Sequence, residues 1–191
     1  MKTLVKNIRA IDPALGLDEV CDILIEGEQI VEVGQDLSAD GAEVLDRTGC
    51  IVVPGLVDVH VHLRDPGQEY KETIETGTAA AAHGGFTGIC SMPNTTPTTD
   101  NAATIDYVLD RAQSAGHCRV YPSGACTMGL KGESLAEIGD MAAHGAVAFT
   151  DDGRGVQSAG MMRRVMDYAK MFGCVVMSHC QDEELVGPGQ V

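Results

Sequence analysis

Two histidines and an arginine stand at every second position of the otherwise apolar stretch VDVHVHLRDPG, as His60, His62 and Arg64. Because side chains alternate faces along a β-strand, these three share one face with Asp58, and the intervening valines occupy the other. Two imidazoles so spaced on a rigid strand can converge on one divalent ion, and imidazole is a favoured ligand of Zn²⁺. Asp58 could then fix one imidazole tautomer as an outer hydrogen-bond acceptor.

An isolated H-x-H pair more often marks two solvent-facing histidines, so a metal site needs further ligands. The sequence Asp151-Asp152-Gly153 follows a strand-like run, and His179 ends another such run. The carboxyl ends of parallel strands meet at one edge, where barrel enzymes keep their chemistry. Taken alone, the Asp-Gly pair is typical of a turn and His179 of a buried core histidine. Their joint placement with the H-x-H pair favours a metal site.

The residues before the two aspartates help to choose between them. Small residues at 146, 148 and 150 alternate with Val147 and Phe149, and bulky residues suit the side that faces the helices. Asp152 shares the face of the small residues. We therefore prefer Asp152 as the ligand, provided that strand geometry extends into the turn.

Strand-like and helical segments alternate along the chain after Pro54. The predicted strands cover 51–62, 87–92, 118–126, 146–150 and 174–180, and the predicted helices cover 73–85, 101–116, 134–145 and 158–173. This α/β pattern indicates parallel strands with crossover helices, either in a TIM-type (β/α)8 barrel or in an open doubly wound sheet. We favour the barrel because no G-x-G-x-x-G follows the first strand. In a barrel the valines around His60 would face the helices.

Two parts of the chain differ in pattern. Residues 1–52 read as a small β module, half of a composite β-sandwich, with a hairpin turn at Gly27-Glu28-Gln29. Residues 53–191 read as the first part of the α/β barrel. A closed barrel needs eight strands and roughly 250 residues, so we expect a barrel truncated after about its fifth strand. We therefore expect these 191 residues to be inactive alone.

Composition excludes several classes of function. The net charge of −15 and the lack of a Lys/Arg-rich run argue against nucleic-acid binding. The amino end lacks the apolar core of a secretory signal, and no later run approaches the ~20 apolar residues of a membrane span. Seven cysteines without C-x-x-C spacing suit reduced thiols, so we expect a cytoplasmic protein without membrane contact.

Five motifs carry a resemblance to a known family. VPGLVDVHVHLRDPGQEYKETIETG, SMPNTTP, YPSGACTMGLKG, AFTDDGRGVQSAGMM and HCQDEEL together resemble dihydroorotases of the aspartate-bridged bacterial type, within the cyclic amidohydrolases. The resemblance implies a hydrolase with two Zn²⁺ ions per active site. It also implies the reversible conversion of dihydroorotate and water to N-carbamoyl-L-aspartate in de novo pyrimidine biosynthesis.

The resemblance also implies roles for individual residues. His60 and His62 would bind the first zinc, His179 the second, and Asp152 would bridge the two. Arg64 and Asn94, together with His62, would bind the substrate, with the planar fork of arginine suited to its carboxylate.

Two family features are altered or lie elsewhere. The general-base aspartate would belong to the C-terminal part of the family's length, so no residue of this sequence is assigned as catalytic. Gln181 stands where the family usually has a glutamate after His-Cys.

Two other functions stay open. A hydantoinase, dihydropyrimidinase or allantoinase type of cyclic amidohydrolase would act on a ring without a carboxylate, and Arg64 discriminates against it. A non-catalytic scaffold of aspartate transcarbamoylase would have no need to keep metal ligands. The expected partners are the small-molecule substrate and either a second copy, in a homodimer, or aspartate transcarbamoylase.

Overall fold

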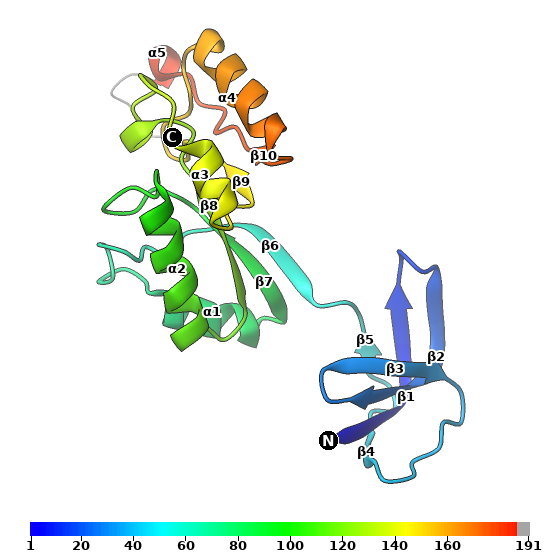
Figure 1. The fold of residues 1–191 in the computed structure, drawn as a ribbon. Helices are drawn as coiled ribbons and strands as arrows, with labels where there is room; N and C mark the ends of the chain where they lie inside the picture. Colours follow the sequence, from blue (N-terminus) through cyan, green and yellow to red (C-terminus); the bar gives the residue numbers. More distant parts are fainter. Residues whose placement is uncertain (187–191) are drawn as a thin grey trace. The chain divides into compact units, whose positions relative to one another are not determined.

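A computed structural model describes residues 1–186 of the protein. The chain divides into two compact units, Met1–Pro54 and the part from Gly55 onward, which are described separately here. Figure 1 traces both units along the chain.

The first unit is a five-stranded sheet. Its strands are β1 (Lys2–Asp12), β2 (Leu17–Glu26), β3 (Gln29–Gly34), β4 (Glu43–Asp46) and β5 (Ile51–Val52). The order is β3-β2-β1-β4, and β5 also pairs with β1. The predicted hairpin is confirmed, because β2 and β3 pair antiparallel around Gly27, which has a φ of 61°. Ile8, Ala10, Cys21 and Ile23 form the core of this sheet.

The second unit is built on a sheet of five parallel strands. These are β6 (Leu56–Val61), β7 (Phe86–Ser91), β8 (Arg119–Gly124), β9 (Ala148–Phe149) and β10 (Val175–Val176). The strands lie side by side in chain order, and each pairs in parallel with the next. A doubly wound sheet reverses its strand order at a switch point. The described sheet has no such reversal, which argues against the open-sheet alternative.

Helices connect successive strands of this sheet (Figure 1). They are α1 (Ile74–His83), α2 (Ala102–Ala115), α3 (Ile138–Ala143) and α4 (Ala159–Met171), with the single turns η1 (Met128–Leu130) and α5 (Glu183–Val186). The side chains of Thr73, Asn101 and Ser158 accept backbone N–H groups at the starts of α1, α2 and α4. Such caps satisfy donors that a helix start leaves free, which explains where these helices begin.

Two predicted elements differ from the structure. The run 51–62 is two strands, because β5 pairs with β1 in the first unit and β6 pairs with β7 in the second. The predicted helix 134–145 is shorter and begins at Ile138. The residues before it form backbone hydrogen bonds with 126–128 instead, and Leu135 bridges Thr127.

Two apolar clusters hold the helices against the parallel sheet. One includes Ile89 of β7 with Ile74 of α1 and Val108 of α2. The other surrounds the fully buried Phe149 of β9, where helices α3 and α4 pack. Val57 and Val59 near His60 are 61% and 64% exposed, so the described helices do not cover them. Within the described residues β6 is an outer strand of the sheet, and α1 packs mainly on β7 and α2.

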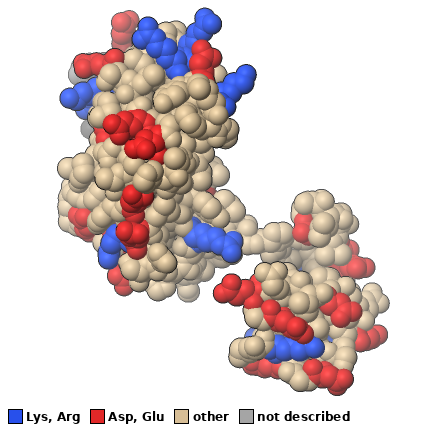
Figure 2. All heavy atoms as spheres, in the orientation of Figure 1, with Lys and Arg blue, Asp and Glu red and all other residues tan. Residues whose placement is uncertain are grey.

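Acidic side chains are spread over the surface of both units in the face that Figure 2 shows. Lys and Arg gather at the end of the second unit where α4 lies, and that helix carries Arg163, Arg164 and Lys170. Within residues 1–186, no helix has the length and apolar character needed to cross a membrane.

Candidate metal centre

Three strands of the second unit deliver imidazoles and a carboxylate to one edge of the sheet. His60 lies near the end of β6, and His62 directly follows the strand. Asp152 comes three residues after β9, and His179 three residues after β10. Because the strands are parallel and consecutive, their carboxyl ends share one edge.

The four predicted ligands meet at the Asp152 carboxylate. His60 Nε2 lies 3.3 Å from Oδ1 of Asp152, and His62 Nε2 lies 3.4 Å from Oδ2. His179 Nδ1 lies 3.3 Å from the same Oδ1. Ligand atoms of His60, His62 and Asp152 all lie within 4.8 Å of one another, and His179 stands outside this group of three. The centre therefore has two sides. The first is the compact group of His60, His62 and Asp152, and the second is His179, which contacts the first only through the Asp152 carboxylate.

The carboxylates of Asp151 and Asp152 contact different groups. The Asp151 carboxylate is buried and accepts the backbone N–H groups of Cys126 and Thr127 at 2.8 and 3.0 Å, together with the Thr127 hydroxyl. Burial raises the pKa of the Asp151 carboxyl, while these hydrogen bonds oppose the rise. Asp151 thus ties the turn after β9 to the loop after β8, and leaves Asp152 to face the histidines.

A glycine brings the turn after β9 against the segment that carries His179. Gly155 has a φ of 70°, and a Cβ at this position would collide with the carbonyl oxygen of His179. Its N–H donates to the Asp151 carbonyl at 2.8 Å. Gln157 adds a second link, because its Nε2 donates to the Gln181 carbonyl at 2.8 Å. The DDGRG sequence therefore combines a ligand with the close approach that positions another ligand.

Asn94, in the loop after β7, joins two of the predicted ligands. Its Nδ2 donates to Asp152 Oδ2 at 3.2 Å, and its Oδ1 lies 3.0 Å from His62 Nδ1. A carboxylate only accepts hydrogen bonds, so the amide nitrogen must face Asp152 and the amide oxygen must face His62. His62 Nδ1 therefore carries the ring proton that Asn94 accepts.

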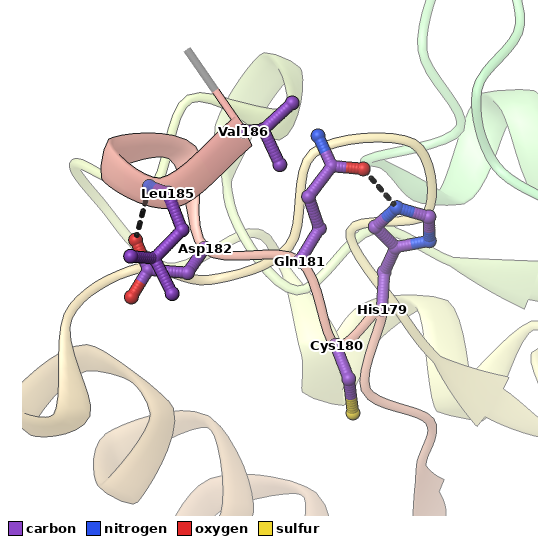
Figure 3. Close-up of a pocket in the computed structure, with 6 residues that line it drawn as sticks. All are labelled: His179, Cys180, Gln181, Asp182, Leu185 and Val186. Atoms are coloured by element: carbon purple, nitrogen blue, oxygen red, sulfur yellow. Dashed lines mark hydrogen bonds between the residues drawn. The ribbon is translucent and has the colours of Figure 1, made fainter. Parts of the chain in front are cut away.

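The Gln181 amide faces the outer ring nitrogen of His179, as Asn94 faces that of His62 (Figure 3). Gln181 Oε1 lies 3.1 Å from His179 Nε2, and Gln181 Nε2 donates to the Glu183 carboxylate at 3.3 Å. The Glu183 carboxylate fixes the amide orientation, so His179 Nε2 carries the ring proton. His179 and Gln181 line a hollow of about 430 Å³ together with Cys180, whose side chain points away from the ring in Figure 3.

The inner nitrogens of His62 and His179 face the Asp152 carboxylate at 3.4 and 3.3 Å. Their outer nitrogens face the side-chain amides of Asn94 and Gln181. Neutral imidazole and carboxylate are ordinary ligands of divalent transition metals. His60, His62, Asp152 and His179 therefore form a donor set that suits a metal.

Other residues of the first motif have different positions from those expected. Asp58 Oδ1 accepts the backbone N–H of His60 at 3.0 Å, so the expectation that Asp58 orients an imidazole ring is wrong. The strand ends at Val61, and Arg64 has a φ of 61°, so strand alternation does not extend to Arg64. A left-handed backbone at a non-glycine residue is strained, and such strain gathers at functional sites.

A buried carboxylate that sequence reasoning missed anchors the loop beyond Arg64. Asp65 accepts the Tyr107 hydroxyl at 2.7 Å and the N–H of Ile74, at the start of α1, at 3.5 Å. The Asp65 contact raises the pKa of Tyr107. The loop beyond Arg64 also meets the loop after β7, because the Thr96 N–H donates to the Pro66 carbonyl at 2.9 Å.

A parallel sheet in consecutive order, with imidazoles and a carboxylate at its carboxyl edge, places the chain in the class of metal-dependent amidohydrolases. Residues 49–191 match the Dihydro-orotase-like family, and the chain belongs to that family. An L-hydantoinase (dihydropyrimidinase) from Arthrobacter aurescens has a similar solved structure, with a TM-score of 0.84 and 26% identity over 96% of this chain and 42% of that one. A solved dihydroorotase shares the fold, with a TM-score of 0.63 and 16% identity.

Curated relatives named dihydroorotase match almost the whole chain. The one from Syntrophotalea carbinolica is 57% identical over 189 residues, which are 99% of this chain and 44% of the relative. The one from Geobacter sulfurreducens is 53% identical over 190 residues, or 45% of its length. The chain thus spans less than half the length of these relatives.

Proposed function

We propose that this chain carries the metal centre of a dihydroorotase, which reversibly converts dihydroorotate and water to N-carbamoyl-L-aspartate. The observation that carries the proposal is the meeting of three imidazole nitrogens at the Asp152 carboxylate, at 3.3 to 3.4 Å. Relatives named dihydroorotase, 57% and 53% identical, support this substrate over other cyclic amides. Because the chain spans 44% of one such relative, the activity is proposed for the protein as a whole.

We propose two Zn²⁺ ions as the metals. His60 and His62 would hold one ion, His179 the other, and Asp152 would be shared, since its Oδ1 contacts both His60 and His179. A metal held here would supply a Lewis acid that lowers the pKa of water and polarises a carbonyl group. The negative charge of the Asp152 carboxylate would offset the repulsion between the two cations. Because Asp152 is buried, water screens this attraction less than it would at the surface.

The proposed substrate-binding groups are Arg64, Asn94 and His62. Within residues 1–186 the Arg64 guanidinium has no hydrogen bond or ion pair, so its fork is available to a substrate carboxylate. Asn94 uses its oxygen on His62 and one N–H on Asp152, which leaves its second N–H for the substrate. His62 Nδ1 faces Asn94 and Nε2 faces the proposed metal position beside Asp152, so His62 would meet the substrate through its ring carbons.

The five parallel strands are proposed to be the first five of an eight-stranded barrel. Consecutive order and ligands at the carboxyl edge support this assignment. In such a barrel a general-base aspartate would come from a later strand, so we assign no residue of this chain to that role.

Hydrolysis assays on the complete protein test the substrate. The assay compares dihydroorotate with hydantoin and dihydrouracil, which lack the ring carboxylate, for the wild type and R64M. Loss of a bidentate, charge-assisted pair should lower kcat/KM for dihydroorotate by at least about 100-fold and leave metal content unchanged. Wild-type protein that hydrolyses only the uncarboxylated rings would refute the dihydroorotase assignment.

A hydantoinase is the second candidate, because the L-hydantoinase of Arthrobacter aurescens reaches a TM-score of 0.84 against this chain. This candidate predicts that R64M keeps its activity on hydantoin and that dihydroorotate is not a substrate. The same assay therefore separates the two functions.

Partner and compartment are also proposals. We propose a cytoplasmic protein, since all seven cysteines are free thiols in the structure. A homodimer or a complex with aspartate transcarbamoylase is proposed as the assembly. Sedimentation of the complete protein, alone and with a transcarbamoylase, would distinguish these from a monomer.

A further inference from the structure

Two side-chain amides face the outer nitrogens of two histidines in the centre. Asn94 faces His62 Nδ1 at 3.0 Å, and Gln181 faces His179 Nε2 at 3.1 Å. The amides come from different loops, one after β7 and one after β10. We propose that Asn94 and Gln181 are positioning residues that set opposite tautomers, Nδ1–H in His62 and Nε2–H in His179, and so decide which ring nitrogen faces the metal.

The direction of each amide is set by a carboxylate behind it. Asn94 gives its N–H to Asp152, which belongs to the centre, and Gln181 gives its N–H to Glu183, which lies outside it. An amide held in this way can offer only its oxygen to the neighbouring ring. Each carboxylate therefore determines, through one amide, where the proton of one imidazole resides.

The two tautomers have a geometric consequence. His62 reaches Asp152 through Nε2, and His179 reaches it through Nδ1. If either ring carried its proton on the inner nitrogen, that nitrogen would donate to Asp152 and could not bind a metal. Partners that orient a metal-binding histidine are typically worth about 10- to 100-fold in metal affinity.

Gln181 has a specific role in this scheme. It stands two residues after His179, and a neutral amide can act only because Glu183 orients it. A glutamate at 181 would accept the same ring proton without help, since it has no donor to orient. Q181E should therefore preserve the tautomer of His179, whereas Q181L should release it.

The test measures tautomers and metal affinity instead of turnover. Ring-nitrogen chemical shifts of isotope-labelled histidines are recorded in the zinc-loaded protein, and H62N and H179N variants identify the two rings. Zinc affinity is measured by competition with a chelator. These readouts rest on the metal centre of the proposed function but not on its substrate, so failure to hydrolyse dihydroorotate would leave them unaffected.

The wild type should give Nδ1–H for His62 and Nε2–H for His179. N94L should disturb the pattern of His62 only, and Q181L that of His179 only, each with about 10- to 100-fold weaker zinc binding. Q181E keeps an acceptor at the same place, so it should retain the wild-type tautomer of His179 and keeps the test informative if Q181L fails to fold. If N94L fails to fold, the ring-nitrogen shifts of His62 in the wild type still test the Nδ1–H assignment.

Another glutamine provides a matched control. Gln68 Nε2 donates to the Asn94 carbonyl at 3.2 Å. Q68A thus loosens the loop of Asn94 without removing the amide that faces His62, and should leave both tautomers unchanged. The proposal is overturned if the wild-type rings show other tautomers, if N94L and Q181L leave them unchanged, or if Q68A alters the tautomer of His62 as N94L does.

Discussion

The two sides of the centre present the same kind of ligand by different means. His60 and His62 belong to the end of β6, a six-residue strand whose Val61 carbonyl accepts the Met92 N–H at 2.9 Å. His179 lies three residues beyond β10, which has only two residues, and depends on Gly155 and Gln157 for its position. Strand pairing positions the first pair, whereas contacts between loops position the single histidine. The His179 side should therefore be the easier one to disrupt.

Asp152 joins the two sides, so its removal should have the largest effect. In D152A the three imidazoles lose their common carboxylate, and zinc affinity should fall by more than about 100-fold, since even the loss of an outer partner costs about 10- to 100-fold. Chelator competition measures the affinity. D106N, which removes an exposed carboxylate of α2, is the control and should bind zinc normally. Equal affinity in D152A and the wild type would contradict the shared-ligand arrangement.

G155A should separate the two sides. The new Cβ would collide with the His179 carbonyl oxygen, and the φ of 70° would strain an alanine. We expect the zinc stoichiometry to fall from two to one, because His60, His62 and Asp152 keep their places. Metal content after gel filtration measures this change. G160A, near the start of α4, introduces a Cβ that meets only ordinary contact and should bind as the wild type does. Loss of both ions in G155A would show that the sides are not independent.

Y107F tests the support of the β6 side. The Tyr107 hydroxyl donates to the buried Asp65 at 2.7 Å, so its loss leaves a buried carboxylate short of one donor. Unfolding free energy from urea titration should fall by about 1–3 kcal/mol. Y121F is the matched control, because no hydrogen bond is found for the Tyr121 hydroxyl within residues 1–186 and the ring is retained. A similar loss in Y121F would point to ring packing instead.

The smallest effect should come from an ion pair remote from both sides. His144, at the end of α3, contacts Asp106 of α2 at 2.9 Å, and this hydrogen bond raises the pKa of His144 above 6.5. A raised histidine pKa stabilises the fold fully below 6.5, and the contribution disappears as pH rises through the raised value. The melting temperature of H144Q should therefore lie below that of the wild type in acid. The gap should close as pH rises through the raised pKa of His144; a gap that widens with pH would contradict the sign.

Much of the fold followed from local pattern. Alternating strand and helix segments after Pro54 predicted the parallel sheet, and the caps at Thr73, Asn101 and Ser158 begin helices close to the predicted starts. The shortened α3 could not be foreseen, because residues 134–136 satisfy their backbone groups with the distant segment 126–128. Such pairing is a tertiary effect, and helix periodicity does not report it.

The site was predictable to the extent that strand geometry applied. The alternation of side chains along a strand selected Asp152 over Asp151. In the structure Asp152 faces the histidines, and Asp151 faces Cys126 and Thr127. The alternation does not reach Arg64 because β6 ends at Val61. The amide contacts of Asn94 and Gln181 depend on how separate loops meet, which no periodicity in the sequence encodes. SMPNTTP nevertheless drew attention to Asn94, although only as a substrate contact.

The consecutive order of the strands has a consequence for how the centre comes into being. Each strand of the second unit pairs with its predecessor in the chain, so a ribosome can release the sheet one strand at a time. His60 and His62 emerge long before Asp152, and His179 comes last of the four. A nascent chain thus passes through a stage with two imidazoles and no carboxylate. Tight capture of an ion must wait until β9 has docked.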